Sequence, residues 1–325
     1  MSTIKSEAKG FISLSVFRLM RPFWIVLLAT SLGLSVNASA FEESKPCEKI
    51  NCETDFSTLY KLANAGDKRA QFKVGLAYEK GRGVAKSDTE AAKWYEKASN
   101  QNELDARHNL ALMYKTGNGV KQDLKRAFEL EKSAAELGNK YAQNGLGLAY
   151  LKGHGTDKNV EFAIKWLTKA AETGLVEAQS NLGSMYENGD GAPIDLEKSF
   201  QWYEKAASSG DSGSQIALGS MYLDGVSVKK NNKLALEWFR KAAINNNKDA
   251  WVITGILLRG NHEGITPNYK ESFYWLKKAA DAGNPDACKL IGDAYKLGIG
   301  VKQDINEANK WYGLSLKIKT QAKKY

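Results

Sequence analysis

The feature that most constrains this chain is a repeat of 36 residues. Alanine recurs at six aligned places, and Ser214 takes the remaining one. The alanines are Ala70, Ala106, Ala142, Ala178, Ala250 and Ala287. The spacing is 36 residues at each step except the last, which is 37. A fixed interval of this length is typical of solenoids, in which each unit stacks only on its neighbours.

The first half of each unit has the spacing of a helix. Counting the aligned alanine as position 0, an aliphatic residue follows at position 4 and a tyrosine at position 8, as in Ala106, Leu110 and Tyr114. Steps of four residues place all three on one helix face. Position 5 is glycine in six of seven units and Ala111 in the other. Because glycine inside a helix costs about 1 kcal/mol relative to alanine, we expect another helix to pack very closely there.

The second half of each unit predicts a second helix. An N-cap residue type stands at position 17 in six units and one place later in repeat six: Ser87, Asp123, Asn159, Asp195, Asn231, Asn268 and Asp304. Glutamate follows three of these, Ser87, Asn268 and Asp304, at the spacing of a capping box. A small residue, a tryptophan and an alanine then share one face, as in Ala91, Trp94 and Ala98. We expect the tryptophan to fill the space opposite the small residues.

Between the two halves lies a Gly-x-Gly segment, first seen as GRGV at 81–84. A phosphate-binding loop would occur once, after a strand. Here the motif recurs at 117–120, 153–156, 189–192 and 298–301, always after a predicted helix. The glycines therefore predict helix C-caps and tight turns and not a ligand cradle.

The pattern A-x-x-x-L-G-x-x-Y-x-x-G-x-G-V, an N-cap, and then A-x-x-W-x-x-x-A-A-x-x-G resembles the Sel1-like repeat, a relative of the tetratricopeptide repeat. The resemblance implies an all-α chain, an α/α solenoid (superhelix) of about seven helix-turn-helix repeats. We expect a signal at 1–40, a linker at 41–55, a capping helix at 56–69, and repeats at 70–105, 106–141, 142–177, 178–213, 214–249, 250–286 and 287–322, the last with a C-terminal cap.

Repeat six departs most from the pattern. Leu258 replaces the tyrosine, RGNHEGITPN replaces the usual turn, and Trp251 stands near the start of the first helix. The segment predicts either a harmless loop variant or a local kink or binding spot.

The N-terminus has the three parts of a secretory signal. Arg18 and Arg21 precede an apolar run at 23–36, and small residues follow at 38–40. We expect cleavage after Ala40 and export to the periplasm or the medium. A retained anchor is the alternative, and membrane contact would then be through this segment alone. Translation from Met20 would give a signal of more usual length.

Two of the three cysteines, Cys47 and Cys52, follow the expected cleavage site. In an exported protein they could form a small disulfide loop. Zinc would need four ligands, and no other cysteine or histidine is near in the sequence. Cys288 lies in a helical pattern and predicts a buried thiol.

No catalytic constellation stands out. His108, His154 and His262 lack metal-ligand spacing. Some cysteine-rich relatives of the Sel1-like family are described as β-lactamase-like, and 227–230 and 115–117 match S-x-x-K and K-T-G. The two motifs come in the wrong chain order, without S-D-N between them. We expect no enzyme, no metal and no cofactor, with a β-lactamase-like enzyme as a remote alternative.

The resemblance implies a scaffold that binds other proteins on the concave face of the solenoid, lined by positions 3, 6 and 10 of the first helices. The candidate residues are Lys73, Lys80, Asn109, Asn181, Asn188 and Asp224. The net charge of +9 is dispersed, which argues against nucleic acid as a partner. The alternative is a protein that binds an envelope glycan, peptidoglycan or a polysaccharide, through exposed aromatic side chains. The aromatic residues fall on predicted core positions, which favours the adaptor.

Overall fold

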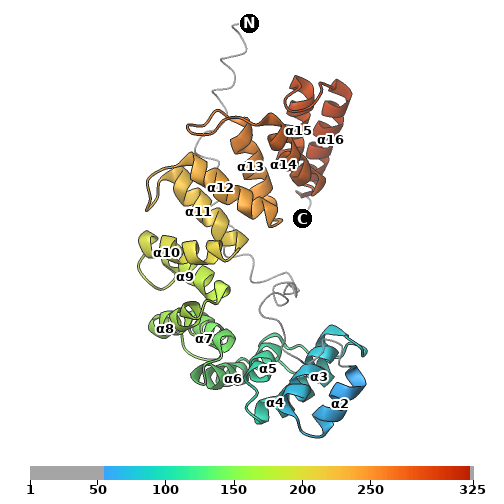
Figure 1. Cartoon of the computed structure of the whole chain (residues 1–325), viewed down its shortest axis with the longest axis vertical. Helices are drawn as coiled ribbons and strands as arrows, with labels where there is room; N and C mark the ends of the chain where they lie inside the picture. Colours follow the sequence, from blue (N-terminus) through green and yellow to red (C-terminus); the bar gives the residue numbers. More distant parts are fainter. Residues whose placement is uncertain (1–54, 323–325) are drawn as a thin grey trace. The chain divides into compact units, whose positions relative to one another are not determined.

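The structure, a computed structural model, describes residues 55–322, which form fifteen α-helices and no strand (Figure 1). The helices are α2 (Phe56–Asn64), α3 (Lys68–Lys80), α4 (Asp88–Asn100), α5 (Leu104–Thr116), α6 (Leu124–Glu136), α7 (Lys140–Lys152), α8 (Val160–Glu172), α9 (Val176–Asn188), α10 (Leu196–Ser208), α11 (Ser212–Asp224), α12 (Asn232–Ile244), α13 (Lys248–Arg259), α14 (Tyr269–Asp281), α15 (Pro285–Leu297) and α16 (Ile305–Ala322). The predicted signal and the pair Cys47 and Cys52 lie outside the described residues.

The odd-numbered helices α3 to α15 are the predicted first helices, and α4 to α16 are the second helices. Each helix packs against the one before and the one after it in the chain. This is the α/α solenoid that the 36-residue interval predicts. The additional helix α2 packs on α3, as the second helix of a preceding repeat would.

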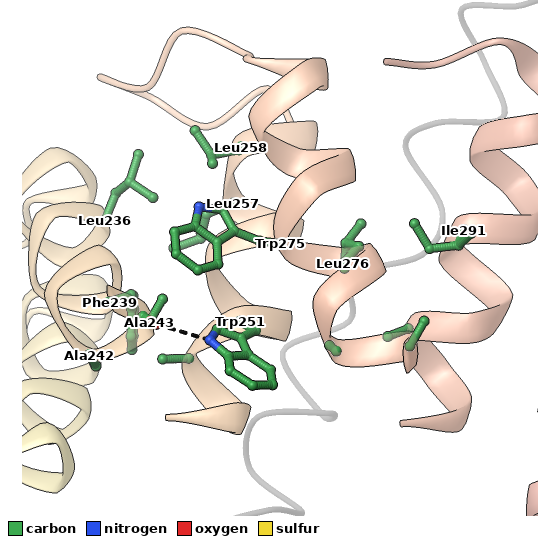
Figure 2. Close-up of a cluster of buried hydrophobic side chains, with 14 of the residues drawn as sticks. Leu236, Phe239, Ala242, Ala243, Trp251, Leu257, Leu258, Trp275, Leu276 and Ile291 are labelled. Carbon is green, nitrogen blue, oxygen red and sulfur yellow. Dashed lines mark hydrogen bonds between the residues drawn. The ribbon is translucent and has the colours of Figure 1, made fainter. Parts of the chain in front are cut away.

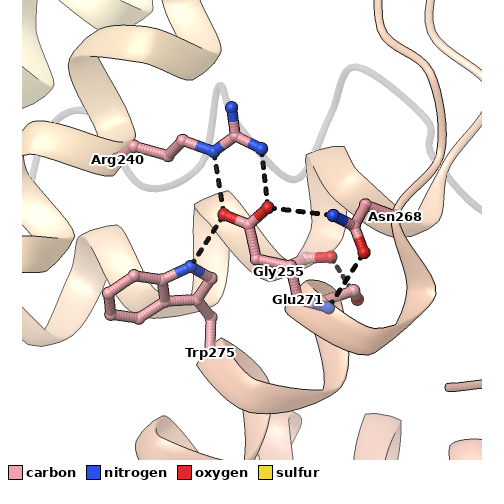
Figure 3. Close-up of polar contacts among 6 residues, drawn as sticks. Arg240, Gly255, Asn268, Glu271 and Trp275 are labelled. Atoms are coloured by element: carbon pink, nitrogen blue, oxygen red, sulfur yellow. Dashed lines mark hydrogen bonds and ion pairs between the residues drawn. The ribbon is translucent and has the colours of Figure 1, made fainter.

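The N-caps form as predicted. Asp123 Oδ1, for example, accepts a hydrogen bond of 2.9 Å from the main-chain nitrogen of Arg126. The capping boxes form only in part. Glu271 N donates to Asn268 Oδ1, but its carboxylate accepts two hydrogen bonds from Arg240 of the preceding second helix, at 2.9 and 2.7 Å (Figure 3). A charged donor binds a carboxylate more strongly than a neutral main-chain N–H does, so the glutamate ties two repeats together.

The Gly-x-Gly segments are turns. Gly81 has φ of 68° and ends α3, and Gly83 has φ of 71°. Both values lie in the left-handed region that favours glycine. In repeat five the second glycine is absent, and Ser227 adopts φ of 58°.

The glycine at position 5 marks a close helix contact, but the partner differs from the one expected. A Cβ on Gly183 would lie 2.6 Å from the ring of Tyr203. The same relation joins Gly75 with Tyr95, Gly147 with Leu167, Gly219 with Phe239, Gly255 with Leu276 and Gly292 with Tyr312. The residue one place after the tryptophan therefore fills the space opposite the glycine, and the expectation for the tryptophan was wrong. The reason is that consecutive residues lie 100° apart around a helix, so the tryptophan and the residue after it point in different directions.

The tryptophans instead lie along the second helices under lysine side chains. The ammonium of the lysine three residues later sits 3.8–4.3 Å from the ring centre in four repeats. The pairs are Trp94 with Lys97, Trp166 with Lys169, Trp202 with Lys205 and Trp238 with Lys241. A cation over an aromatic face is favourable, and the lysine stem covers apolar ring surface.

Adjacent repeats are also joined by a hydrogen bond at position 1. In four repeats a glutamine there donates to the carbonyl eight residues earlier, near the end of the preceding second helix; Gln179, for example, reaches Ala171 O at 3.1 Å. Arg107, Trp251 and Cys288 make the same contact with Ser99, Ala243 and Ala280. Each of these carbonyls also accepts the main-chain N–H three residues later, so the first helix adds a second donor at the end of the preceding helix.

Repeat six is integrated into the core. Trp251 is buried with Phe239, Leu258 and Leu276 in the largest apolar cluster of the described residues (Figure 2). The long loop after α13 returns to this cluster through Ile265, which is 7% exposed. Asn232 Nδ2 donates to Glu263 O at 2.9 Å and holds the loop against α12. Within residues 55–322 no helix is long and apolar enough to cross a membrane.

Candidate functional site

The first candidate site is the first-helix face, defined here as positions 3, 6 and 10 of the first helices. Of its predicted residues, Lys73, Lys80, Asn188 and Asp224 are exposed. The other two, Asn109 and Asn181, are half-buried. The six residues lie on α3, α5, α9 and α11, the first helices of repeats one, two, four and five.

The half-buried amides of this face are held by neighbouring helices. Asn181 Nδ2 donates to Asn144 Oδ1 at 3.0 Å and links α9 to α7. The hydroxyl of Tyr95 reaches the face from α4 and donates to Glu79 Oε2 at 2.6 Å. Burial, followed by the Glu79 carboxylate, raises the pKa of Tyr95, while a hydrogen bond from Asn109 acts in the opposite direction. Asn144 was not predicted as a site residue.

The character of the first helices changes along the chain. In α9 the side chains at positions 2, 3 and 6 are Ser180, Asn181 and Ser184. From α11 onward half-buried aliphatic side chains take most of these places: Ile216, Ala217, Val252, Ile253, Ile256 and Leu290. At positions 3 and 6 the face is mixed in α3 and α5, which carry Lys73, Leu76, Asn109 and Leu112, polar in α9, and aliphatic in α13.

Exposed aromatic side chains lie elsewhere. Those of the described residues that stand out from the surface are Tyr60, Phe162, Tyr269 and Tyr274. All four belong to second helices or to α2. The aromatic residues of the first helices, such as Tyr114 and Tyr186, are partly buried and pack against the core.

A second candidate site is a buried polar cluster between repeats two and three. Glu131 of α6 occupies the place that tyrosine, leucine or phenylalanine fills in the other six repeats, and it is 6% exposed. Its Oε2 lies 3.0 Å from Nδ1 of His108 on α5. Its Oε1 faces Gly145 of α7, where an added Cβ would collide with it. The short acid and the glycine together leave a cavity of about 20 Å³, which Lys115 and His154 also line.

The electrostatics of this cluster follow from its burial. Desolvation raises the pKa of Glu131, while His108 and then Lys115 act to lower it. Desolvation and the nearby Lys152 lower the pKa of Lys115. The pKa of His154 is lowered by burial and by Lys115 and Lys152. Each of these shifts favours the uncharged form of its group.

In this cluster the acidic group lies on the second helix, whereas in other repeats it lies on the first helix. In repeats one and four a tyrosine of the second helix donates to a glutamate at position 9, as Tyr203 does to Glu187 at 2.9 Å. In repeat two the acid is on the second helix, and position 9 holds Lys115. Among the described residues no group of three or more His, Cys, Asp and Glu is placed to hold a metal ion. The cavity is large enough for one water molecule.

Glu131 was not among the site residues predicted from the sequence. A signal was present: one carboxylate at a position that is large and apolar or aromatic in every other repeat. The motifs weighed for β-lactamase chemistry lie on different repeats, 115–117 at the end of α5 and 227–230 after α11. His262 belongs to the repeat-six loop, where burial and then Lys230 lower its pKa.

Comparison with known protein families identifies the repeat. The sequence model of the family described as Sel1 repeat matches seven segments: 68–103, 104–139, 140–175, 176–211, 212–247, 255–284 and 285–316. A search of curated protein sequences found no match.

Two solved structures are similar to this chain over most of its length. One is c5321, a protective antigen present in uropathogenic Escherichia coli strains that displays an SLR fold, with 30% identity and a TM-score of 0.75 over 83% of this chain and 56% of that one. The chain therefore spans little more than half the length of that antigen. The other is a Sel1 repeat protein from Oxalobacter formigenes, with 29% identity and a TM-score of 0.63 over 83% of this chain and 79% of that one.

Proposed function

Because the chain belongs to the Sel1 repeat family, whose fold is typically a non-enzymatic protein-binding scaffold, we propose that it is an adaptor of the cell envelope. It binds other proteins along the first-helix face. The observation that carries the proposal is the composition of that face. It presents amides and charges such as Lys73, Asn109 and Asn181, together with aliphatic side chains such as Ile253 and Ile256.

This composition suits an extended segment of a partner protein. Amide side chains can donate to and accept from a peptide backbone at the same time. Half-buried aliphatic side chains add apolar contact without the cost of desolvating charges. A glycan-binding surface would instead present aromatic faces, and the exposed aromatic residues of 55–322 lie on second helices or on α2. The proposal therefore includes no catalysis, no cofactor and no nucleic acid.

The test is capture of crosslinked partners from the envelope fraction, with the chain from Phe41 as bait. A face variant would combine Lys73→Glu, Lys80→Glu, Asn188→Arg and Asp224→Lys, four exposed positions. A matched control would carry Lys93→Glu, Lys165→Glu and Glu237→Lys on exposed parts of second helices. A protein captured by the original chain and the control but lost with the face variant supports the proposal.

Two other results would count against it. Equal capture by all three baits would place the binding site away from the first-helix face. Capture of peptidoglycan or polysaccharide fragments without protein would make the glycan reading the better one.

Export is part of the proposal and rests on the signal-like residues 18–40. Reporter fusions that begin at Met1 and at Met20 test it, and secretion from Met1 alone would exclude the shorter start. In an oxidising compartment we expect Cys47 and Cys52 to be bonded to each other. The mass of the alkylated protein before and after reduction checks this pairing.

A further inference from the structure

The buried Glu131 is an expensive group that the solenoid does not require. In the other repeats the same place is filled by Tyr, Leu or Phe packed on a glycine or its neighbours. A buried carboxylate loses its hydration and regains only part of it through the partners it finds. Departures from a local rule at such cost are typical of functional positions.

The surroundings of Glu131 indicate what that function is. The cavity beside it, about 20 Å³, has room for one water and not for a metabolite. Its carboxylate faces two helices besides its own. Oε2 lies 3.0 Å from Nδ1 of His108 on α5, and Oε1 occupies the space that a Cβ on Gly145 of α7 would fill. His108 itself stacks on Tyr141 of α7, with ring centres 6.1 Å apart. The group therefore lies where the second repeat meets the third.

We propose that Glu131 and His108 make this joint respond to protons: when Glu131 takes up a proton as the pH falls, α6 and α7 hold each other more tightly. The two states are a closed joint, in which Glu131 is buried, and an opened joint, in which water reaches its carboxylate. Deprotonation favours the opened joint because a hydrated carboxylate no longer bears the cost of burial.

The sign follows from linkage. Burial raises the pKa of Glu131 in the closed joint above its ordinary value. The stabilisation from its proton is therefore complete below the ordinary value and is lost as the pH rises through the raised one. His108 and Lys115, both on α5, act to lower the pKa of Glu131. Lys152 at the end of α7 and His154 in the turn after it are the other titratable groups of the cluster. His154 has the opposite dependence, since its lowered pKa makes protonation unfavourable in the closed joint.

The experiment compares the full chain with Glu131→Gln, which keeps the shape and removes the titration. Glu136→Gln, at an exposed position of the same helix, is the matched control. Amide hydrogen exchange is followed at about pH 5 and about pH 8. The opening of α6 and α7 is expressed relative to that of α10 and α11, because α10 has Tyr203 at the place of Glu131. We expect relative opening to increase by up to about tenfold per pH unit across the titration in the original chain and in Glu136→Gln.

In Glu131→Gln the increase of relative opening with pH should be lost, and only the opposite dependence of His154 should remain. A relative opening that is constant in the original chain, or an identical pH dependence in Glu131→Gln, would overturn the proposal. If the variant does not fold, the titration of Glu131 can be read directly in the folded original chain from its side-chain carboxyl carbon by NMR. A midpoint at or below the ordinary value for glutamate would equally refute it. No partner protein is involved, so the result is independent of the adaptor proposal.

Discussion

Trp251 Nε1 donates a hydrogen bond to the main-chain oxygen of Ala243, 2.9 Å away (Figure 2). The contact has the same position in the repeat as that of Gln215 with Ala207, at 3.1 Å. An indole thus replaces an amide as the second donor to a carbonyl at the end of the preceding helix, beside the main-chain N–H of Asn246, while its rings add apolar contact in the core of repeat six. The unusual tryptophan of this repeat is a structural substitute and not an exposed binding residue.

Replacing Trp251 by phenylalanine should therefore lower the free energy of unfolding by more than the smaller ring alone would. The smaller ring still occupies the core, and the carbonyl of Ala243 keeps its main-chain donor, Asn246 N at 3.1 Å, but it loses the indole hydrogen bond, whose net contribution is about 0.5–1.5 kcal/mol. Denaturation by urea would measure the loss. Trp238→Phe is the control, since that half-exposed ring lies under Lys241 and should cost less. Equal losses in the two variants would contradict the role given to the hydrogen bond.

Gly183→Ala tests the close contact between first and second helices. Alanine is the better helix former by about 1 kcal/mol, but its Cβ would lie 2.6 Å from the ring of Tyr203. Overpacking should dominate and destabilise the chain by about 1–3 kcal/mol. Gly313→Ala in α16, where an added Cβ meets nothing within 4 Å, should be neutral or stabilising. If both variants gain stability, the glycine is not kept for packing.

The pair of Arg240 and Glu271 should contribute measurable coupling between repeats five and six (Figure 3). The bond is bidentate, and Glu271 also accepts from Trp275 and Asn268. Because the side chains are 36% and 28% exposed, a double-mutant cycle with Arg240→Met and Glu271→Gln should give only about 1 kcal/mol.

Added salt should reduce the coupling of Arg240 and Glu271, because exposed charges are screened. The pair Lys310 and Glu307, whose side chains are 71% and 35% exposed, serves as the comparison and should couple by less. A coupling for Arg240 and Glu271 no greater than for this exposed pair would show that the bidentate geometry adds nothing.

Cys288 should be unreactive in the folded chain. Its side chain is fully buried, and desolvation, followed by Asp281, raises the pKa of the thiol. The thiolate is the reactive form, so alkylation should require local or global unfolding. In a chain with Cys47→Ser and Cys52→Ser, mass spectrometry would follow alkylation with and without denaturant. Stoichiometric labelling without denaturant would contradict the burial of this thiol.

The parts of the fold that repeat could be predicted from the sequence. The seven N-cap positions, the glycine turns and the close contact at position 5 each recur, so a single local rule is supported by several independent copies. The tryptophan was assigned to the wrong side because a sequence pattern fixes the helix face only to within about one residue. The structure shows that its neighbour, for example Tyr203 after Trp202, is the residue that meets the glycine.

The candidate sites could be predicted less well. Exposed charges such as Lys73 and Asp224 follow from helix spacing, but the link between Asn181 and Asn144 joins two repeats and depends on how they stack. The contact of Glu131 with His108 combines residues that are 23 positions apart, from two helices. No single-helix pattern contains that relation, although the unusual residue type at Glu131 is visible in the alignment of the repeats.

The lysines that cover the tryptophans have a consequence for solubility. Six tryptophans lie on second helices, and the exposed surface of such rings could let neighbouring chains associate. Over four of these rings lies the ammonium group of the lysine three residues later, 3.8 Å from the ring centre in the case of Lys241 and Trp238. The same side chain thus hides apolar surface and repels a second copy of the protein. Concentrated solutions should therefore tolerate these rings, provided that the lysine stems remain in place.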